Sequence, residues 1–245
     1  MHNTICSNSF INCDLYNAKL LENESNGKLL INTINQYSYC IAEKDLTFKK
    51  ALQESDILLP DGIGIVLAVK LLKNKKISKI AGADLHNYLL KNLNKKKGKC
   101  FYLGSSKETL SKIIQRLSFE FPDIAVETFS PPFKNEFSDI ENQQMIEKIN
   151  SFNPDVLFVG MTAPKQEKWV HEHKEILSAK IICSIGAVFD FYAQTIIRPN
   201  EIWIKLGLEW FARLIREPKR MWRRYLYYGP IFIWLVLKRK LKSTF

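Results

Sequence analysis

The stretch Ile57-Leu58-Leu59-Pro60-Asp61-Gly62-Ile63-Gly64-Ile65-Val66 is a short apolar run that breaks at a single acid before a second apolar segment begins. A run bounded by Pro60 and Gly62 is typical of a buried strand. Gly62 and Gly64 let the backbone approach a ligand closely where the next helix starts. We therefore expect Asp61 on the floor of a site, where its carboxylate could serve as a base. Asp before Gly is also an ordinary turn or helix N-cap pair.

Apolar strands and helices alternate on both sides of this stretch. Besides the strand that carries Asp61, we expect strands at Lys28–Asn35, Lys99–Leu103, Ala125–Phe129, Val156–Gly160 and Lys180–Ile185. We expect helices at Tyr37–Ser55, Ile63–Leu72, Asp84–Leu93, Lys107–Phe121, Asp139–Asn150 and Pro164–Leu177. This alternation implies right-handed crossovers and a largely parallel sheet with helices on both faces. The predicted fold class is α/β and Rossmann-like.

Small or polar residues follow five of these strands, at the sheet edge where such folds bind ligands. The five segments are Thr33-Ile34-Asn35, Pro60-Asp61-Gly62, Leu103-Gly104-Ser105-Ser106, Gly160 with Pro164-Lys165-Gln166-Glu167, and Gly186-Ala187-Val188-Phe189-Asp190. The Gly104 segment opens a helix and could bind a phosphate, although Ser105 is equally well explained as a helix N-cap. The chain lacks the G-x-G-x-x-G and P-loop motifs, which disfavours a nicotinamide dehydrogenase or an NTPase.

Composition indicates a globular protein without a metal site or disulfide framework. The 245 residues are 46% hydrophobic, which suffices for a real core. The five cysteines form no C-x-x-C pair, and the four histidines form no ligand constellation. The first ten residues lack the features of a signal peptide, so we expect a cytoplasmic protein.

The net charge of +11 is concentrated in the C-terminal segment. Residues 1–190 contain 24 Lys and Arg against 22 Asp and Glu, whereas residues 191–245 contain 12 against 3. The apolar face of Ile202–Ile215 and the run Pro230–Leu237 lie among aromatic and basic residues; the eight-residue run is too short to span a bilayer. Such a segment fits a membrane surface, but also a core or oligomer contact, or nucleic acid. We predict an α/β catalytic domain at 1–195 and a basic, amphipathic, membrane-associating helical appendage at 196–245.

An ordered set of motifs resembles the bacterial WecG/TagA/CpsF glycosyltransferases, also called glycosyltransferase family 26. The motifs run from about residue 30 to 225: Thr33-Ile34-Asn35, Leu59–Gly64, Gly82-Ala83-Asp84-Leu85, Tyr102-Leu103-Gly104, Val159–Glu167, Gly186–Asp190, Gly207-Leu208-Glu209-Trp210, Arg213-Leu214, Glu217-Pro218-Lys219-Arg220 and Arg224-Tyr225.

The resemblance implies a metal-independent, inverting transfer of an N-acetylmannosamine-type sugar. The donor would be a UDP-sugar and the acceptor an undecaprenyl-diphosphate-linked sugar, in cell-surface polysaccharide or teichoic acid synthesis. On this resemblance Asp61 and Thr33 are the catalytic residues. Asp61 is the base, Thr33 with Asn35 helps to hold the donor or the acceptor, and the arginines meet the diphosphates. The implied substrate-binding residues are Asn35, Gly62, Lys79, Gly104, Gln166, Glu167, Phe189, Asp190, Arg213, Arg220 and Arg224.

The expected partners are the UDP-sugar, the lipid-linked acceptor and the inner face of the plasma membrane, but not nucleic acid; a homo-oligomer is plausible. The chain departs from the family pattern in two places. Lys79 stands where Arg is usual, which keeps the charge but loses the planar fork. The loop Ala193–Asn200 has Gln194 in place of Gly and Pro199-Asn200 in place of Ala-Pro, which bears on donor choice more than on reaction type. The alternative function is a non-catalytic nucleotide-sugar binding protein at the membrane surface.

Overall fold

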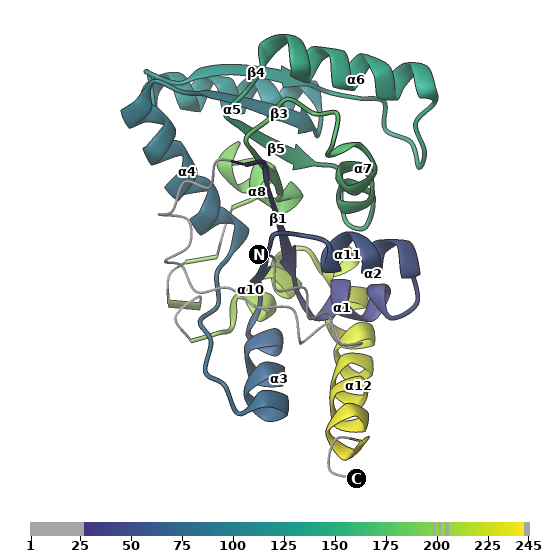
Figure 1. The fold of residues 1–245 in the computed structure, drawn as a ribbon. Coiled ribbons are helices and arrows are strands. Elements are labelled where there is room, and N and C mark those ends of the chain that lie inside the picture. The colour runs from purple at the N-terminus through teal and green to yellow at the C-terminus, as the bar shows by residue number, and fades with distance from the viewer. Residues whose placement is uncertain (1–26, 198, 201, 204–205, 243–245) are drawn as a thin grey trace.

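The centre of the computed structural model is a six-stranded parallel sheet with the order β2-β1-β6-β5-β3-β4 (Figure 1). The structure describes residues 27–197, 199–200, 202–203 and 206–242. The strands are β1 (Leu29–Ile34), β2 (Ile57–Pro60), β3 (Lys99–Gly104), β4 (Ala125–Phe129), β5 (Val156–Gly160) and β6 (Ile181–Ser184). This sheet confirms the predicted α/β, Rossmann-like fold.

Helices connect and cover the strands. They are α1 (Gln36–Ala42), α2 (Leu46–Gln53), α3 (Ile63–Lys73), α4 (Gly82–Lys96), α5 (Lys107–Glu120), α6 (Asp139–Phe152), α7 (Lys165–His173), α8 (Gly186–Tyr192), α10 (Glu209–Arg216), α11 (Pro218–Trp222), a π-helix at Arg223–Tyr227 and α12 (Tyr228–Lys242). The prediction of one helix over Tyr37–Ser55 is wrong, because Asp45 caps a new helix by accepting a hydrogen bond from the Phe48 amide at 2.9 Å. Helix α8 was not predicted, and α7 ends at His173 rather than Leu177.

Alternating strand residues pack against different helices, as a sheet covered on both faces requires. Tyr102 and Phe158 belong to a core with residues of α4, α5 and α8. Phe101 and Leu157 belong to a second core with residues of α6 and α7. A third apolar cluster joins the β1 and β2 end of the sheet to α1, α2, α3 and α12.

The strand register gathers the carboxyl ends of the strands at one edge. Ile34 pairs with Pro60, and the Asp61 amide donates to the Ile34 carbonyl at 2.9 Å. The segment after α3 returns to this edge, where the Ile80 amide donates to the Pro60 carbonyl at 3.0 Å. Lys79 is thereby carried back beside Asp61.

The C-terminal helix α12 contacts α1 and α3. Its side chains Tyr228, Phe232 and Val236 are buried in the third cluster. Within the described ranges, none of the helices has the length and apolar character needed to cross a bilayer. The division at residues 195 and 196 stays a prediction, and the predicted run Ile202–Ile215 lies partly outside the described residues.

Candidate active site

Two cavities meet at Asp61, beyond the carboxyl ends of the strands. The larger is a cleft of about 1670 Å³ that extends over β1, β3, β5 and β6, and the smaller has a volume of about 320 Å³. The residues that line both are Asn35, Tyr37, Asp61, Glu209, Arg213 and Arg224. A group bound in either cavity would therefore lie near the Asp61 carboxylate.

The structure brings nearly all of the predicted site residues to these two cavities. Those that line only the larger cleft are Thr33, Gly104, Gln166, Glu167, Asp190 and Arg220. Gly62 and Lys79 line only the smaller cavity. Phe189 is buried in the core beside Tyr102, with ring centroids 5.2 Å apart. The catalytic and binding roles of all these residues stay predictions.

Asp61 is partly buried, between acidic and basic neighbours. Burial, reinforced by the negative charge of Glu209, raises the pKa of Asp61 from 3.8 to about 6, against the opposing effect of Lys79 and Arg213. A carboxyl group with this pKa is ionised near neutral pH, yet it holds a proton more strongly than an ordinary aspartate. These are the properties required of a general base.

Sequence reasoning did not select Glu209 as a site residue, although it lies in a quoted motif. Its carboxylate forms an ion pair with the ammonium group of Lys79, and both side chains are largely buried. Glu209 begins α10, whereas Lys79 precedes α4, so the C-terminal segment contributes directly to the surroundings of Asp61. Only the folded chain reveals this contact between residues 130 positions apart.

The arginines of the C-terminal segment also reach the cavities. The Arg224 guanidinium lies 4.9 Å from the Tyr37 ring centroid, and the Arg213 guanidinium lies 5.2 Å from that of Phe191. The buried Nε of Arg213 has no hydrogen-bond partner among the described residues. A buried donor without a partner is costly unless a ligand satisfies it. Arg213 is therefore well suited to bind an anionic substrate group.

Arg220 lies at the exposed rim of the larger cleft. Its guanidinium is 3.0 Å from the Glu217 carboxylate and 3.7 Å from that of Asp190. Burial raises the pKa of Asp190, although Arg220 opposes this effect. The pair links α8, which contains Asp190, to the C-terminal segment.

Gln166 and Glu167 form a buried polar pair at the start of α7. The Gln166 Oε1 accepts a hydrogen bond from the Met161 amide at 3.2 Å, and its Nε2 donates to Glu167 Oε1 at 2.9 Å. Burial raises the pKa of Glu167 to about 7, and its Oε2 has no partner among the described residues. Gln166 thus holds the loop after β5 through its hydrogen bond with Met161. The sequence alone did not indicate this role.

At the floor of the larger cleft, two glycines lie where there is no room for a side chain. A Cβ at Gly104, where φ is +114°, would lie 2.3 Å from the Gly160 carbonyl oxygen. A Cβ at Gly160 would lie 2.8 Å from the Phe189 ring. Phe189 therefore supports the floor from beneath.

In the part of the chain that the structure describes, no three or more His, Cys, Asp or Glu residues lie together as a metal site would require. Cations also line the cavities, among them Lys79, Arg213, Arg220 and Arg224.

Known proteins match the chain over nearly its whole length. The model of the Glycosyl transferase WecG/TagA/CpsF family matches residues 11–245. A Bacillus subtilis (strain 168) protein named N-acetylglucosaminyldiphosphoundecaprenol N-acetyl-beta-D-mannosaminyltransferase is 32% identical over 217 residues, covering 88% of this chain and 82% of its own. Two proteins of the same name also match. The one from Bacillus spizizenii is 31% identical and the match covers 80% of this chain and 74% of its own. The one from Staphylococcus aureus strain MW2 is 28% identical and the match covers 90% of this chain and 84% of its own. With the motifs placed around one cleft, these matches establish that the chain belongs to the WecG/TagA/CpsF family of glycosyltransferases.

Proposed function

We propose that this glycosyltransferase moves N-acetylmannosamine from a UDP donor to N-acetylglucosamine on undecaprenyl diphosphate. The names of the relatives support the transferred sugar and the lipid-linked acceptor. Two cavities that meet at one carboxylate suit a reaction between two substrates. The product would serve the synthesis of a cell-surface polysaccharide or teichoic acid.

The position of Asp61 at the junction of the cavities carries this proposal. In the reaction, a hydroxyl oxygen of the acceptor sugar attacks the anomeric carbon of the donor, and Asp61 takes the hydroxyl proton. The bond between the anomeric carbon and the UDP oxygen breaks, and UDP leaves with the bonding electrons. Attack from the face opposite UDP inverts the anomeric configuration.

The cationic side chains would replace a metal ion in this step. Arg213 and Arg224 line both cavities, and guanidinium groups bind diphosphates through paired hydrogen bonds. Positive charge held there would offset the negative charge that develops on the departing UDP. We therefore propose that the transfer requires no metal.

The test is UDP release from a panel of UDP-sugars, with a polyprenyl-diphosphate-linked N-acetylglucosamine acceptor and with EDTA present. We expect release from UDP-N-acetylmannosamine only when the acceptor is added, and not from UDP-N-acetylglucosamine. The anomeric configuration of the product, measured by NMR, tests inversion. Loss of activity in EDTA with recovery on adding a divalent cation would refute the metal-independent mechanism.

We further propose that the enzyme works at the inner face of the plasma membrane, held there in part by α12. This helix exposes Ile233, Trp234, Leu237 and Leu241. Deleting it would also expose the third apolar cluster, since Phe232 and Val236 are buried there. The double variant Trp234→Glu/Leu237→Glu is a cleaner test, and it should weaken sedimentation with anionic vesicles while the melting temperature is retained.

A further inference from the structure

Helix α3, which follows Asp61 directly, has an exposed apolar stripe. Ile63, Leu67 and Leu71 are 38%, 56% and 44% exposed, and their spacing of four residues places them on one side of the helix. The opposite side, with Ile65, Ala68 and Val69, is buried in the third apolar cluster. A helix that covers a sheet normally has a polar outer face, so the stripe on α3 calls for a different explanation.

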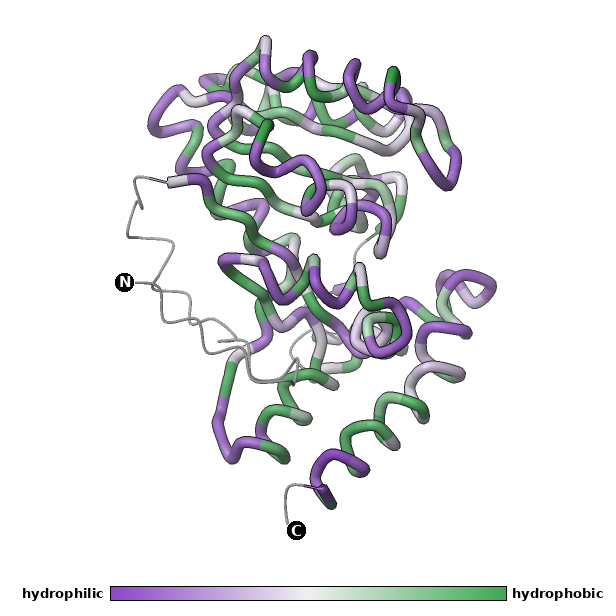
Figure 2. The backbone as a smooth tube through the Cα atoms, turned by 45° about the vertical axis from the view of Figure 1, so that its right-hand side comes forward, coloured by the Kyte–Doolittle hydropathy of each residue, from purple (hydrophilic) through white to green (hydrophobic). Residues whose placement is uncertain are grey.

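Helix α3 lies beside α12, which has exposed apolar side chains of its own. The two helices are in contact, and a Cβ at Gly64 would lie 3.5 Å from a ring carbon of Phe232. In Figures 1 and 2 both helices project side by side from the same end of the molecule, beyond the sheet. In Figure 2 the tube is largely green along both helices and turns purple at their C-terminal ends.

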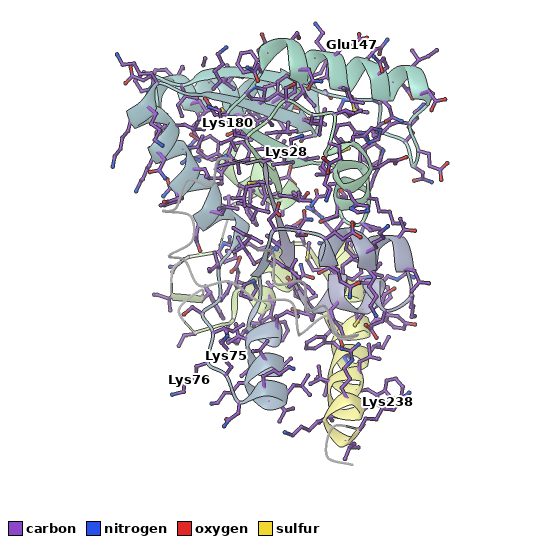
Figure 3. The ribbon with its side chains drawn as sticks, viewed as in Figure 1. Lys28, Lys75, Lys76, Glu147, Lys180 and Lys238 are labelled. Atoms are coloured by element: carbon purple, nitrogen blue, oxygen red, sulfur yellow. The ribbon has the colours of Figure 1, made fainter. Side chains whose placement is uncertain are left out.

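Basic residues surround this pair of helices. Lys70 and Lys73 lie on the last turns of α3, and Figure 3 places Lys75, Lys76 and Lys238 at the same end of the molecule. The Lys238 ammonium lies 4.7 Å from the ring centroid of Trp234. The sequence contains no Asp or Glu from residue 62 to 83 or from 218 to 245. Apolar stripes with lysines and without acids are complementary to an anionic lipid surface.

We propose that α3 is a second membrane-contacting helix, which docks with α12 on the surface of an anionic bilayer. Both helices contact the bilayer from its surface, because neither is long and apolar enough to span it. Ile63, at the start of the stripe, also lines the smaller cavity beside Asp61. Docking of α3 would therefore place the lipid surface next to that cavity. This inference extends the proposed function, since a lipid-linked acceptor would approach from this side.

The experiment compares the full-length protein with the double variant Leu67→Glu/Leu71→Glu. The control is Phe119→Glu/Ile140→Glu, which places the same charges on exposed apolar positions of α5 and α6, 79% and 72% exposed. Sedimentation is measured with vesicles of phosphatidylcholine alone and with 30 mol% phosphatidylglycerol, a composition chosen for the assay on the basis of the anionic-lipid argument. Circular dichroism and melting curves check that each variant is folded.

We expect the α3 variant to bind the anionic vesicles at least about tenfold more weakly, and the control to stay within about twofold of the wild type. Equal binding by the α3 variant and the wild type would overturn the proposal. Light scattering without lipid tests the alternative that a second copy of the chain covers the stripe. A wild-type dimer that becomes a monomer in the α3 variant, with vesicle binding unchanged, would support this alternative and overturn the proposal. Vesicle binding needs no substrate, so its failure is distinguishable from failure of the proposed transferase reaction.

Discussion

Replacing Asp61 by Asn should make the protein more stable at neutral pH while nearly abolishing turnover. Asn has the same shape but carries no charge, so it removes the cost of holding an ionised carboxylate in a partly buried position. The pKa of Asp61 rises from 3.8 to about 6 on folding, and each unit corresponds to about 1.4 kcal/mol. The ionised carboxylate therefore lowers the free energy of unfolding by at most about 3 kcal/mol at pH 7.

The pH dependence of this difference follows from the sign of the shift. Below about pH 4 Asp61 is protonated in the folded and unfolded states, so the wild type and Asp61→Asn should be almost equally stable. Between about pH 4 and 6 the unfolded chain releases the proton first, and the wild type loses stability relative to the variant. Above about pH 6 both states are ionised and the difference stays constant.

Thermal unfolding at pH 4, 5, 6 and 7 measures this difference. Because Asn also has to be desolvated, we expect a gain of about 1–3 kcal/mol at pH 7, or about 2–12 °C in Tm for a chain of this size. Asp123→Asn, at an exposed position, is the control and should change neither Tm nor turnover.

Turnover should respond in the opposite direction. Loss of a general base lowers rates by about 10² to 10⁴-fold, and kcat/KM of the wild type should rise with pH to a plateau above about pH 6. A variant that is no more stable than the wild type at pH 7 would refute the electrostatic argument. Wild-type turnover in Asp61→Asn would show that another group removes the proton.

Three further substitutions test the surroundings of Asp61. Glu209→Gln removes the negative charge that raises the pKa of Asp61, so the acidic limb of the pH–activity profile should move to lower pH; an unmoved limb would contradict this coupling. Gly104→Ala should lower Tm by about 4 °C or more, because its Cβ would lie 2.3 Å from the Gly160 carbonyl oxygen. This corresponds to a loss of at least about 2 kcal/mol in the free energy of unfolding. An unchanged Tm would show that the floor of the cleft can shift. Arg213→Lys keeps the positive charge but loses the planar guanidinium group, so kcat/KM should fall about tenfold or more. Wild-type kinetics in this variant would exclude bidentate binding of the substrate by Arg213.

The fold could be predicted because its pattern is local. Short apolar runs such as Val156–Gly160 are bounded by turn residues, and helices of suitable length separate them. Parallel strands place their carboxyl ends at one edge, so Asn35 and Asp61 were expected to lie together. The break between α1 and α2 escaped prediction because apolar periodicity continues across Asp45, whose capping hydrogen bond interrupts the helix.

The surroundings of the site depend on contacts that no local pattern contains. Lys79 and Glu209 pair across 130 positions. The motif containing Gln166 was recognised, but its amide turns inward to Met161, and Phe189 lies under the floor rather than in the cleft. The apolar face of α3 could not be distinguished from a buried one, because periodicity shows that a face is apolar but not what covers it.

On the proposed function, the difference between the two cavities would let one carboxylate serve substrates of opposite character. The larger cleft is bordered by polar loops that include Ser105 and Lys134, and it suits a donor that diffuses through water. The smaller cavity is bordered by Ile63 and by Leu206, which is 65% exposed, so its mouth is continuous with apolar surface. A lipid-linked sugar approaching along that surface would reach Asp61 without its polyprenyl chain entering water. Because only Gly62 separates Asp61 from α3, docking of this helix on the bilayer would also fix the distance of the base from the lipid surface.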